Sequence, residues 1–361
     1  MRISLLEKRE DFYKILNITL NNYIKNLNLN NSKLSFFVVN KYLNFIANPY
    51  LPSSLFNILK NEYSNSNIKW KKIFQFFYVQ LAVQKVLRLL FAQKIIRLPN
   101  YFSDFLILGG NHRIRLFSET LNGSLVILKS KERDKYIYND IKIRESFCLS
   151  FAPIILDKGK DWFIEEYFEG TPINRIRKEN DYNLDSLLKV YQNELLDPSK
   201  EVLTIKDYKK MINLDLETVL EVNFESNVKK ELDGLIIKTF RTLFHLITIK
   251  RVEISWTHGD LQEANILIKN KQLKVIDWES ADKRFYLYDY FTLFSEIRTN
   301  ISFKKSIDIF KAKFSIDMNV VYLLLIEELR FSLNEEFSLN FLNSGENTKK
   351  LCNDILNFIN E

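Results

Sequence analysis

Residues 256–268 read WTHGDLQEANILI, and residues 273–279 read LKVIDWE. His258, Asp260 and Asn265 fit the pattern H-x-D-x-x-x-x-N, and Asp277 stands twelve positions after Asn265, at the end of a short apolar run. Phosphoryl transfer needs a carboxylate that orients the attacking hydroxyl, and hard oxygen ligands for Mg²⁺. Asp260 can serve as the carboxylate, and Asn265 with Asp277 can serve as the ligands. The pattern therefore predicts a phosphotransferase site.

The same stretch resembles the aminoglycoside phosphotransferase/choline kinase family, which shares the protein-kinase-like fold. The resemblance rests on HGDLQEANIL at 258–267 and VIDWE at 275–279. It implies that Asp260 is the catalytic base and that Asn265 and Asp277 bind Mg²⁺.

Three further positions match the family pattern. His258 is expected to orient the loop, and Asp289 of LYDYF is expected to brace it. Glu279 matches an acidic position whose role in the family is less uniform. Gln262 and Ala264 depart from the pattern, because His and Gly are common there.

The resemblance also orders the elements upstream. Strand alternation in SLVILK places Ile127 and Lys129 on one face. Ile127 then matches a residue that covers adenine, and Lys129 matches the lysine that holds the α- and β-phosphates, with Lys131 as the alternative. Glu145 in the next helix is expected to pair with Lys129.

Two loops complete the expected nucleotide site. The stretch LGGNHR at 108–113 lies where a phosphate-covering loop belongs, although it is not G-x-G-x-x-G. Backbone amides there can approach a phosphate. The stretch FIEEY at 163–167 occupies the place of an interlobe hinge whose backbone would bind adenine. The resemblance thus implies ATP and Mg²⁺ as cofactors, with Gly109, Gly110, Asn111, Glu165, Glu166 and Tyr167 near the nucleotide.

The surrounding pattern predicts an α+β, bilobal fold. Short alternating strands occur from residue 101, with a hairpin signal at Asn122–Gly123, and the chain beyond 170 is mainly helical. We expect a small antiparallel-sheet N-lobe at 101–170 and a helical C-lobe at 171–361. Residues 1–100 are expected to form a helical extension, with helices near 33–47, from Pro52 onward, and over 69–97.

Composition excludes several classes of protein. The chain is 46% hydrophobic and 27% charged, which is enough apolar material for a sizeable core, so it is not disordered throughout. Only 8 Gly and 6 Pro among 361 residues exclude collagen-like sequence. Two cysteines cannot form a disulfide scaffold. The sequence shows neither a secretory signal nor a long apolar run, so we expect a cytoplasmic protein.

Basic residues gather in the first part of the chain. Residues 1–150 hold 23 Lys and Arg against 10 Asp and Glu, a balance of +13. The sequence contains no recognisable nucleic-acid module, so we do not expect nucleic acid as a partner. Residues 69–97 hold seven basic residues and no acidic one, with Gln80, Gln84 and Arg88 as a polar stripe. We expect this helix to pack against the following domain. The alternative is peripheral contact with a membrane or a lipid-linked glycan.

These observations together predict an ATP-dependent kinase that phosphorylates a hydroxyl group of a small molecule, such as a sugar, an amino alcohol or an aminoglycoside-like compound. A nucleotide-binding pseudokinase is one alternative, and it would keep its function after Asp260→Asn. A protein kinase is the other alternative. Against it, the segment between Asp277 and Asp289 is too short for a long activation segment.

Overall fold

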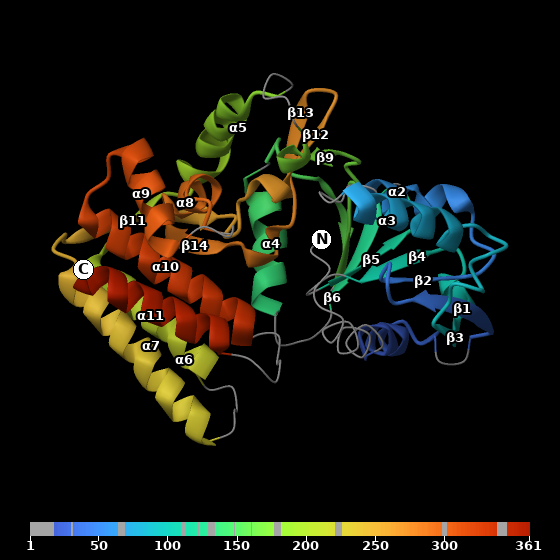
Figure 1. Cartoon of the computed structure of the whole chain (residues 1–361), viewed down its shortest axis with the longest axis horizontal. Coiled ribbons are helices and arrows are strands. Elements are labelled where there is room, and N and C mark those ends of the chain that lie inside the picture. Colours follow the sequence, from blue (N-terminus) through green and yellow to red (C-terminus); the bar gives the residue numbers. More distant parts are fainter. Residues whose placement is uncertain are drawn as a thin grey trace. The chain divides into compact units, whose positions relative to one another are not determined.

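The computed structural model describes residues 18–29, 32–63, 69–109, 113–121, 123–128, 134–147, 149–159, 161–176, 182–220, 226–297, 302–337 and 345–361. The chain divides into two compact units. The first comprises Met1–Asp134 and Pro153–Thr171, and the second comprises Lys135–Ala152 and Pro172–Glu361. Figure 1 labels their helices and strands.

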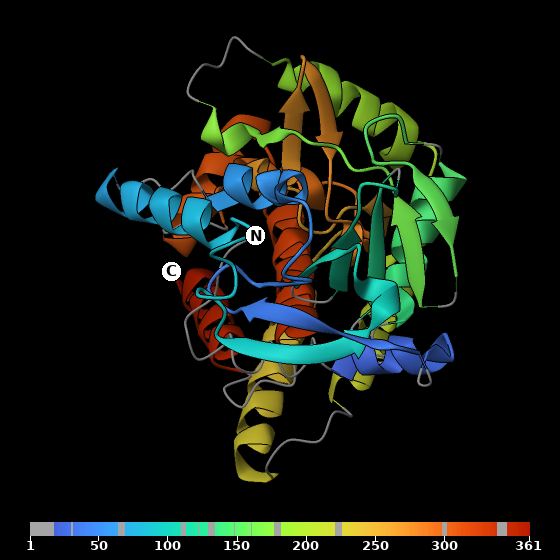
Figure 2. The ribbon, with the colours of Figure 1, turned by 90° about the vertical axis from the view of Figure 1, so that its right-hand side faces the viewer.

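An eight-stranded antiparallel sheet forms the first unit, in the order β3-β1-β2-β4-β5-β6-β8-β7. Figure 2 shows the outermost pair, β1 in blue beside β3 in cyan. Two helices, α2 (Asn57–Tyr63) and α3 (Lys69–Ala82), belong to the same unit. The strands are β1 (Leu34–Asn40), β2 (Phe45–Ala47), β3 (Lys94–Pro99), β4 (Leu106–Gly109), β5 (Arg113–Phe117), β6 (Ser124–Leu128), β7 (Ile155–Lys158) and β8 (Trp162–Glu165).

The prediction that residues 1–100 are helical is wrong for two of the expected helices. Residues 33–47 form β1 and β2 instead of a helix, and β2 pairs with β4, so both strands belong to the main sheet. The helix expected over 69–97 ends at Ala82, and the chain then turns and enters β3. The helix expected from Pro52 onward is confirmed, since a 3₁₀ turn at Ser53–Phe56 leads into α2.

Two apolar clusters hold the first unit together. One contains Phe37, Ile107, Ile114 and Ile127 from β1, β4, β5 and β6. The other joins strands β1, β2 and β4 to α2 and α3, with Phe45, Phe56, Val79 and Leu106 as members. Because strand side chains alternate between two faces, a sheet buried on both faces is expected to need two such clusters.

Helices make up most of the second unit, and short strands that belong to two small sheets accompany them. The helices are α4 (Asp134–Ser146), α5 (Leu184–Tyr191), α6 (Ile205–Leu220), α7 (Ser226–Leu246), α8 (Tyr288–Phe294), α9 (Phe303–Phe314), α10 (Met318–Phe337) and α11 (Glu346–Asn360). The strands β10 (Glu201–Thr204), β11 (Arg251–Thr257) and β14 (Asp282–Phe285) form one antiparallel sheet. β12 (Ile266–Lys269) and β13 (Gln272–Val275) form a hairpin, and β9 (Thr171–Pro172) lies where the chain passes between the units.

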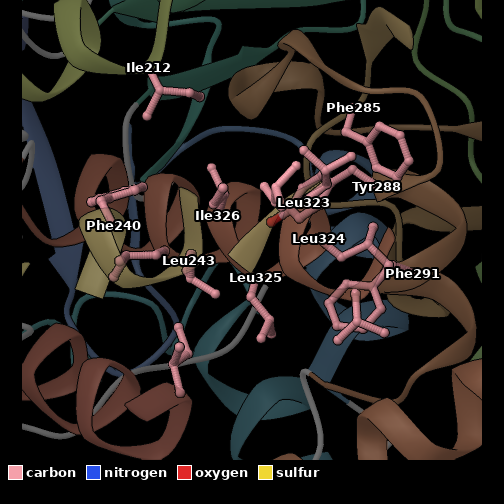
Figure 3. Packing of buried hydrophobic residues seen from close by; sticks show 14 of the residues in the cluster. Ile212, Phe240, Leu243, Phe285, Tyr288, Phe291, Leu323, Leu324, Leu325 and Ile326 are labelled. Atoms are coloured by element: carbon pink, nitrogen blue, oxygen red, sulfur yellow. The ribbon is translucent and has the colours of Figure 1, made fainter. Parts of the chain in front are cut away.

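Helix α10 is the centre of the largest apolar cluster. Its sequence VVYLLLIEEL is apolar around most of its circumference, and Leu323, Leu324, Leu325 and Ile326 are all buried. A helix that is apolar on every side is expected to lie inside a core. Figure 3 shows these side chains packed with others from α6, α7, β14 and α8. No helix in the described parts of the chain is long and apolar enough to cross a lipid bilayer.

Candidate active site

Two strand pairings bring the residues of the H-x-D-x-x-x-x-N motif and the VIDWE stretch together within the second unit. The β12–β13 hairpin turns at Asn270 and Lys271, which both have positive φ angles, as a tight two-residue hairpin turn requires. Asn265 precedes β12 and Ile276 follows β13, so they meet at the open end of the hairpin. The Ile276 amide donates a hydrogen bond to the Asn265 carbonyl oxygen at 2.9 Å. The spacing of twelve residues between Asn265 and Asp277 is therefore explained by the single hairpin that lies between them.

The loop that begins at His258 follows directly from β11. Thr257, the last residue of β11, pairs with Asp282 at the start of β14, and the Thr257 hydroxyl donates to the Asp282 carbonyl oxygen at 2.9 Å. Gly259 has a φ of +85°, a conformation that residues with a side chain rarely adopt. A β-carbon there would lie 2.2 Å from the Ser280 carbonyl oxygen, so the backbone of the two loops meets at this glycine.

The buried imidazole of His258 joins the two loops. Its Nε2 lies 2.9 Å from the Ile276 carbonyl oxygen, which can only accept a hydrogen bond. Its Nδ1 lies 3.3 Å from the Asp260 amide, which can only donate one. Both contacts are satisfied by the neutral ring with its proton on Nε2. The ring therefore links Asp260 to the residue that precedes Asp277.

The carboxylate of Asp289 holds the start of the loop. It lies in the first turn of α8, is completely buried, and accepts hydrogen bonds from the amides of His258 at 2.7 Å and Gly259 at 2.9 Å. The hydroxyl of Tyr191, at the end of α5, also donates to it. Hydrogen bonds to a carboxylate are stronger than those between neutral groups, so Asp289 fixes the backbone from which Asp260 projects.

Sequence reasoning missed Tyr191, which is 98 positions from Asp289 and carries no motif. Its hydroxyl also accepts a hydrogen bond from the His258 amide at 3.1 Å. Burial, reinforced by the Asp289 carboxylate, raises the pKa of the Tyr191 phenol well above its ordinary value of 10.0. The phenol therefore stays protonated and remains a donor to Asp289.

Asp260 is half-buried, and two amide side chains contact it. Gln262 Nε2 donates to Asp260 Oδ2 at 2.8 Å. Asn265 Nδ2 donates to the Asp260 carbonyl oxygen at 2.9 Å and lies 3.3 Å from Oδ2. Gln262 stands where the family pattern commonly has His, and its contact with Asp260 was not predicted. These donors set the orientation of the Asp260 carboxylate.

Asp277 has a left-handed backbone, with a φ of 71° and a ψ of 53°. Asp tolerates this region better than most residues with a side chain. The conformation turns the chain sharply from β13 into a 3₁₀ turn at Trp278–Ser280 that also contains the half-buried Glu279. The Trp278 indole is buried, donates to the Val275 carbonyl oxygen at 2.9 Å, and packs 4.8 Å from the His258 ring centroid. The packing of Trp278 therefore fixes where the backbone of Asp277 lies in the structure.

The donor set at the open end of the hairpin fits Mg²⁺. Because Asn265 Nδ2 donates to Asp260, the Asn265 amide presents its oxygen in a different direction. A half-buried amide oxygen and a half-buried carboxylate from Asp277 are hard donors of the kind that Mg²⁺ uses together with substrate phosphates. Among the described residues, no group of three or more His, Cys, Asp or Glu side chains is placed to hold a metal ion.

The residues expected near the nucleotide are only partly described. Lys129, its alternative Lys131, Gly110 and Asn111 lie outside the described residues, and Gly109 ends β4. Glu145 is exposed in the last turn of α4, and its expected pairing with Lys129 stays a prediction.

Four described residues of the expected adenine site, Ile127, Glu165, Glu166 and Tyr167, lie in the first unit. Ile127 is packed in an apolar cluster of the sheet. Glu165 is buried at the end of β8, where its carboxylate pairs with Arg115 at 3.2 Å. The Glu166 amide donates to the Ile154 carbonyl oxygen at 2.8 Å, which continues the β7–β8 pairing past the end of the strand.

Tyr167 follows this strand end. Its ring packs edge-on against Phe117, with the centroids 5.0 Å apart. The structure therefore gives Ile127, Glu165 and Tyr167 packing or pairing roles that the sequence did not predict, and their contact with adenine stays a prediction.

Behind the loop lies a buried network of charged residues that the sequence also did not reveal. Arg330 of α10 binds the carboxylates of Asp282 at 2.7 Å and Glu327 at 3.1 Å. Arg284 of β14 donates to the Thr257 hydroxyl at 3.1 Å and to the Ser280 carbonyl oxygen at 2.8 Å. The network connects α10 to both ends of the loop pair that holds the candidate site.

No protein-family model matches the chain, and no curated protein matches its sequence. Solved structures do match. The apo form of a thermostable mutant of aminoglycoside phosphotransferase APH(4)-Ia aligns with a TM-score of 0.51 and 15% identity, over 71% of this chain and 94% of that one. A variant of the same enzyme in ternary complex with AMP-PNP and hygromycin B aligns with a TM-score of 0.52 and 14% identity, over 71% and 93%. A further variant, with ADP and hygromycin B, aligns with a TM-score of 0.50 and 15% identity, over 71% and 94%.

These matches confirm the predicted resemblance at the level of the fold. The chain has the α+β, bilobal, protein-kinase-like fold, with an antiparallel sheet and a mainly helical part. The predicted fold class is confirmed, apart from the helical character expected of residues 1–100.

Proposed function

We propose that this protein is an ATP-dependent phosphotransferase that phosphorylates a hydroxyl group of a small molecule. Two kinds of observation support the proposal. The fold is that of aminoglycoside phosphotransferase APH(4)-Ia, and the second unit holds an aspartate, an asparagine and a second aspartate in one hydrogen-bonded loop pair. Fold alone does not define activity, so the argument rests on the loop pair.

The observation that carries the proposal is the position of Ile276. Its amide donates to the Asn265 carbonyl oxygen, and its carbonyl oxygen accepts a hydrogen bond from the His258 ring, which in turn accepts from the Asp260 amide. Asp277 is the next residue. The three side chains proposed to perform the reaction are therefore tied to one another through a single backbone position.

In the proposed reaction, Asp260 orients the acceptor hydroxyl and takes its proton. The hydroxyl oxygen forms a bond to the γ-phosphorus of ATP while the bond from that phosphorus to the β,γ-bridging oxygen breaks, which releases ADP. Gln262 and Asn265 keep the Asp260 carboxylate in place by donating hydrogen bonds to it. Asp289 and Tyr191 hold the loop from behind.

Mg²⁺ would be held by the Asn265 amide oxygen and the Asp277 carboxylate. A bound magnesium ion neutralises the charge of the phosphates during transfer. We further propose that Lys129, with Glu145 as its partner, binds the α- and β-phosphates. In this proposal the 109–111 loop covers the phosphates, and Ile127 with residues 165–167 forms the adenine site.

The acceptor is proposed to be a polyhydroxylated or amino-alcohol compound. The matching enzyme structures were solved with hygromycin B, an aminoglycoside, which supports an acceptor of similar chemistry. Contact of residues 69–97 with a lipid-linked glycan stays a prediction that depends on a different surface.

A screen of acceptors with the purified full chain tests the proposal. Sugars, amino alcohols and aminoglycosides are each incubated with Mg-ATP, and phosphorylated product is detected by mass spectrometry. For an accepted compound, Asp260→Asn is expected to lower kcat by roughly 10²–10⁴-fold, the usual contribution of a positioned general base. Asp308→Asn, an exposed change of the same kind on α9, is the matched control and is expected to leave kcat unchanged. Equal product formation by wild type and Asp260→Asn would contradict the proposal.

A further inference from the structure

Exposed apolar side chains gather on α3 and on the turn that follows it. On α3, Ile73, Phe76, Phe77 and Leu81 are exposed and recur at the i, i+3, i+4, i+8 spacing of one helix face, while Val79 and Ala82 on the other side are buried. This helix therefore presents an apolar face outward as well as one toward its own unit.

The turn at 83–91 presents the most exposed aliphatic side chains of this region. Val86 is 84% exposed and Leu90 is 79% exposed, and Leu89 is 47% exposed. Tyr50, at 73%, lies beside them, since Lys85 Nζ is 5.8 Å from its ring centroid. Clustered exposed apolar residues usually mark a surface that binds something. We call the surface formed by Val86, Leu89 and Leu90 of the turn, together with Tyr50, the turn surface.

A buried arginine builds this turn. The guanidinium of Arg88 donates to four backbone carbonyl oxygens, those of Asn48 at 3.2 Å, Pro49 at 3.0 Å, Leu51 at 2.9 Å and Val83 at 2.8 Å. It also lies 4.0 Å from the Phe56 ring centroid. Burial lowers the pKa of Arg88 to about 10, so the group remains charged at neutral pH. The apolar side chains of the turn surface are thus held outward by a fixed structure.

The charge of the region indicates which partner fits. Residues 18–109 contain eleven Lys and Arg but only two acidic residues, Glu62 and Asp104. Lys85, Lys94 and Arg97 are exposed. Arg97 lies 5.0 Å from the ring centroid of Phe36, which is exposed on β1. A second copy of this chain would bring like charges together, whereas an anionic bilayer offers apolar depth beneath negative headgroups.

We propose that the turn surface and the exposed face of α3 dock this protein on an anionic phospholipid bilayer. The exposed aliphatic and aromatic side chains enter the boundary between headgroups and acyl chains. Exposed basic residues of the same unit contact the headgroups, Lys85 beside Tyr50 among them. The association is peripheral, and none of the residues that make it is among those proposed to bind the nucleotide, the metal ion or the acceptor.

Vesicle flotation of the full chain tests this proposal. The probes are vesicles of phosphatidylcholine with phosphatidylglycerol, and vesicles of phosphatidylcholine alone. Wild type is expected to float with the anionic vesicles at low salt and to be released as salt rises, because Coulomb attraction to the surface is screened. Val86→Asp/Leu90→Asp is expected to lower the apparent affinity by about tenfold or more, since it replaces inserting apolar groups with charges that the surface repels.

Val202→Asp/Leu214→Asp, at two apolar positions of the second unit that are each 56% exposed, is the matched control and is expected to bind like wild type. Because the altered side chains in both double variants are exposed, unchanged melting temperatures are expected and are measured first.

Three outcomes would overturn the proposal. They are the absence of wild-type binding to anionic vesicles at low salt, equal binding by Val86→Asp/Leu90→Asp, and equal binding to the neutral vesicles. Light scattering without vesicles gives a further test. If wild type is a dimer and Val86→Asp/Leu90→Asp is a monomer, a second copy of the chain occupies this surface, and the proposal is overturned.

Discussion

Position 259 shows how closely the backbone of the candidate site is packed. A β-carbon on this residue would lie 2.2 Å from the Ser280 carbonyl oxygen and 2.4 Å from Arg284 Nη1, and the φ of +85° disfavours any side chain. Gly259→Ala is therefore expected to lower the free energy of unfolding by roughly 2–4 kcal/mol, through backbone strain and displacement of the Ser280 loop. Chemical denaturation measures this change.

Gly234→Ala is the matched control for that substitution. Gly234 lies inside α7, and a β-carbon there meets nothing within 4 Å. Alanine is the better helix former, so the same change is expected to stabilise the protein by about 0.5–1 kcal/mol. If Gly259→Ala lowered the free energy of unfolding by no more than the small change that Gly234→Ala causes, the two loops would not be in contact at position 259.

Tyr191 gives the site a dependence on alkaline pH. Its pKa is raised in the folded protein, so it contributes stability below the unfolded value of about 10, and that contribution is lost as pH rises toward the folded pKa. Tyr191→Phe is expected to cost about 1–2 kcal/mol at pH 7, because Asp289 loses a donor. Between pH 9 and 11, the free energy of unfolding of Tyr191→Phe is expected to fall less steeply than that of wild type. Denaturation across this pH range measures both effects, and parallel curves would contradict the assignment.

At the residue scale, the motif predicts what is local and misses what is distant. The motif residues His258, Asp260, Asn265 and Asp277 lie within 20 residues of one another. Their spacing was enough to indicate that they belong to one site, and a single hairpin brings them together. Tyr191 reaches the same site from another helix, and no spacing rule indicates it. Gln262 was recognised only as a departure from the family pattern, since its contact with Asp260 depends on the loop conformation.

At the element scale, α10 holds the loops through its buried charges. Arg330 is 3% exposed, and its partner Asp282 is 5% exposed. Arg330→Met is expected to destabilise the protein by about 3–5 kcal/mol, because it leaves buried carboxylates without their cation. Lys349→Met is the control: Lys349 pairs with Glu231 on the surface, where the loss is expected to be at most about 1 kcal/mol. Equal effects of the two substitutions on the denaturation midpoint would contradict this role of α10.

Non-local contacts explain the elements that the sequence mispredicted. Residues 83–91 contain good helix formers, yet Arg88 binds carbonyl oxygens of residues 48–51 and the chain turns there instead. Residues 34–40 and 45–47 are rich in aromatic and β-branched residues, and their strands form because β3 and β4 lie on either side. Helical spacing of apolar residues over such short segments does not distinguish the two structures. The hairpin of β5 and β6, whose partners are adjacent in sequence, was predicted correctly.

At the scale of the whole molecule, the first unit is larger than the sequence predicted. A kinase-like sheet was expected from residue 101 onward, but β1, β2 and β3 extend it on the side of β4. Residues 34–63 and 69–99 therefore contribute to the same apolar clusters as β4, β5 and β6 and are part of the fold. The described basic residues of this region, among them Lys85, Lys94 and Arg97, belong to the surface of a folded unit.

The measurement that tests the central claim most directly is thermal unfolding of wild type and Asp277→Asn, with and without Mg-ATP. Asn tolerates the left-handed backbone of position 277, so the variant is expected to fold and to lose only the carboxylate ligand. A ligand at 100 times its dissociation constant stabilises the folded state by about 2.7 kcal/mol. We expect Mg-ATP to raise the melting temperature of wild type by a few degrees, and the rise to disappear with a chelator or in Asp277→Asn. No rise with Mg-ATP or Mg-GTP, or an equal rise in Asp277→Asn, would contradict the account.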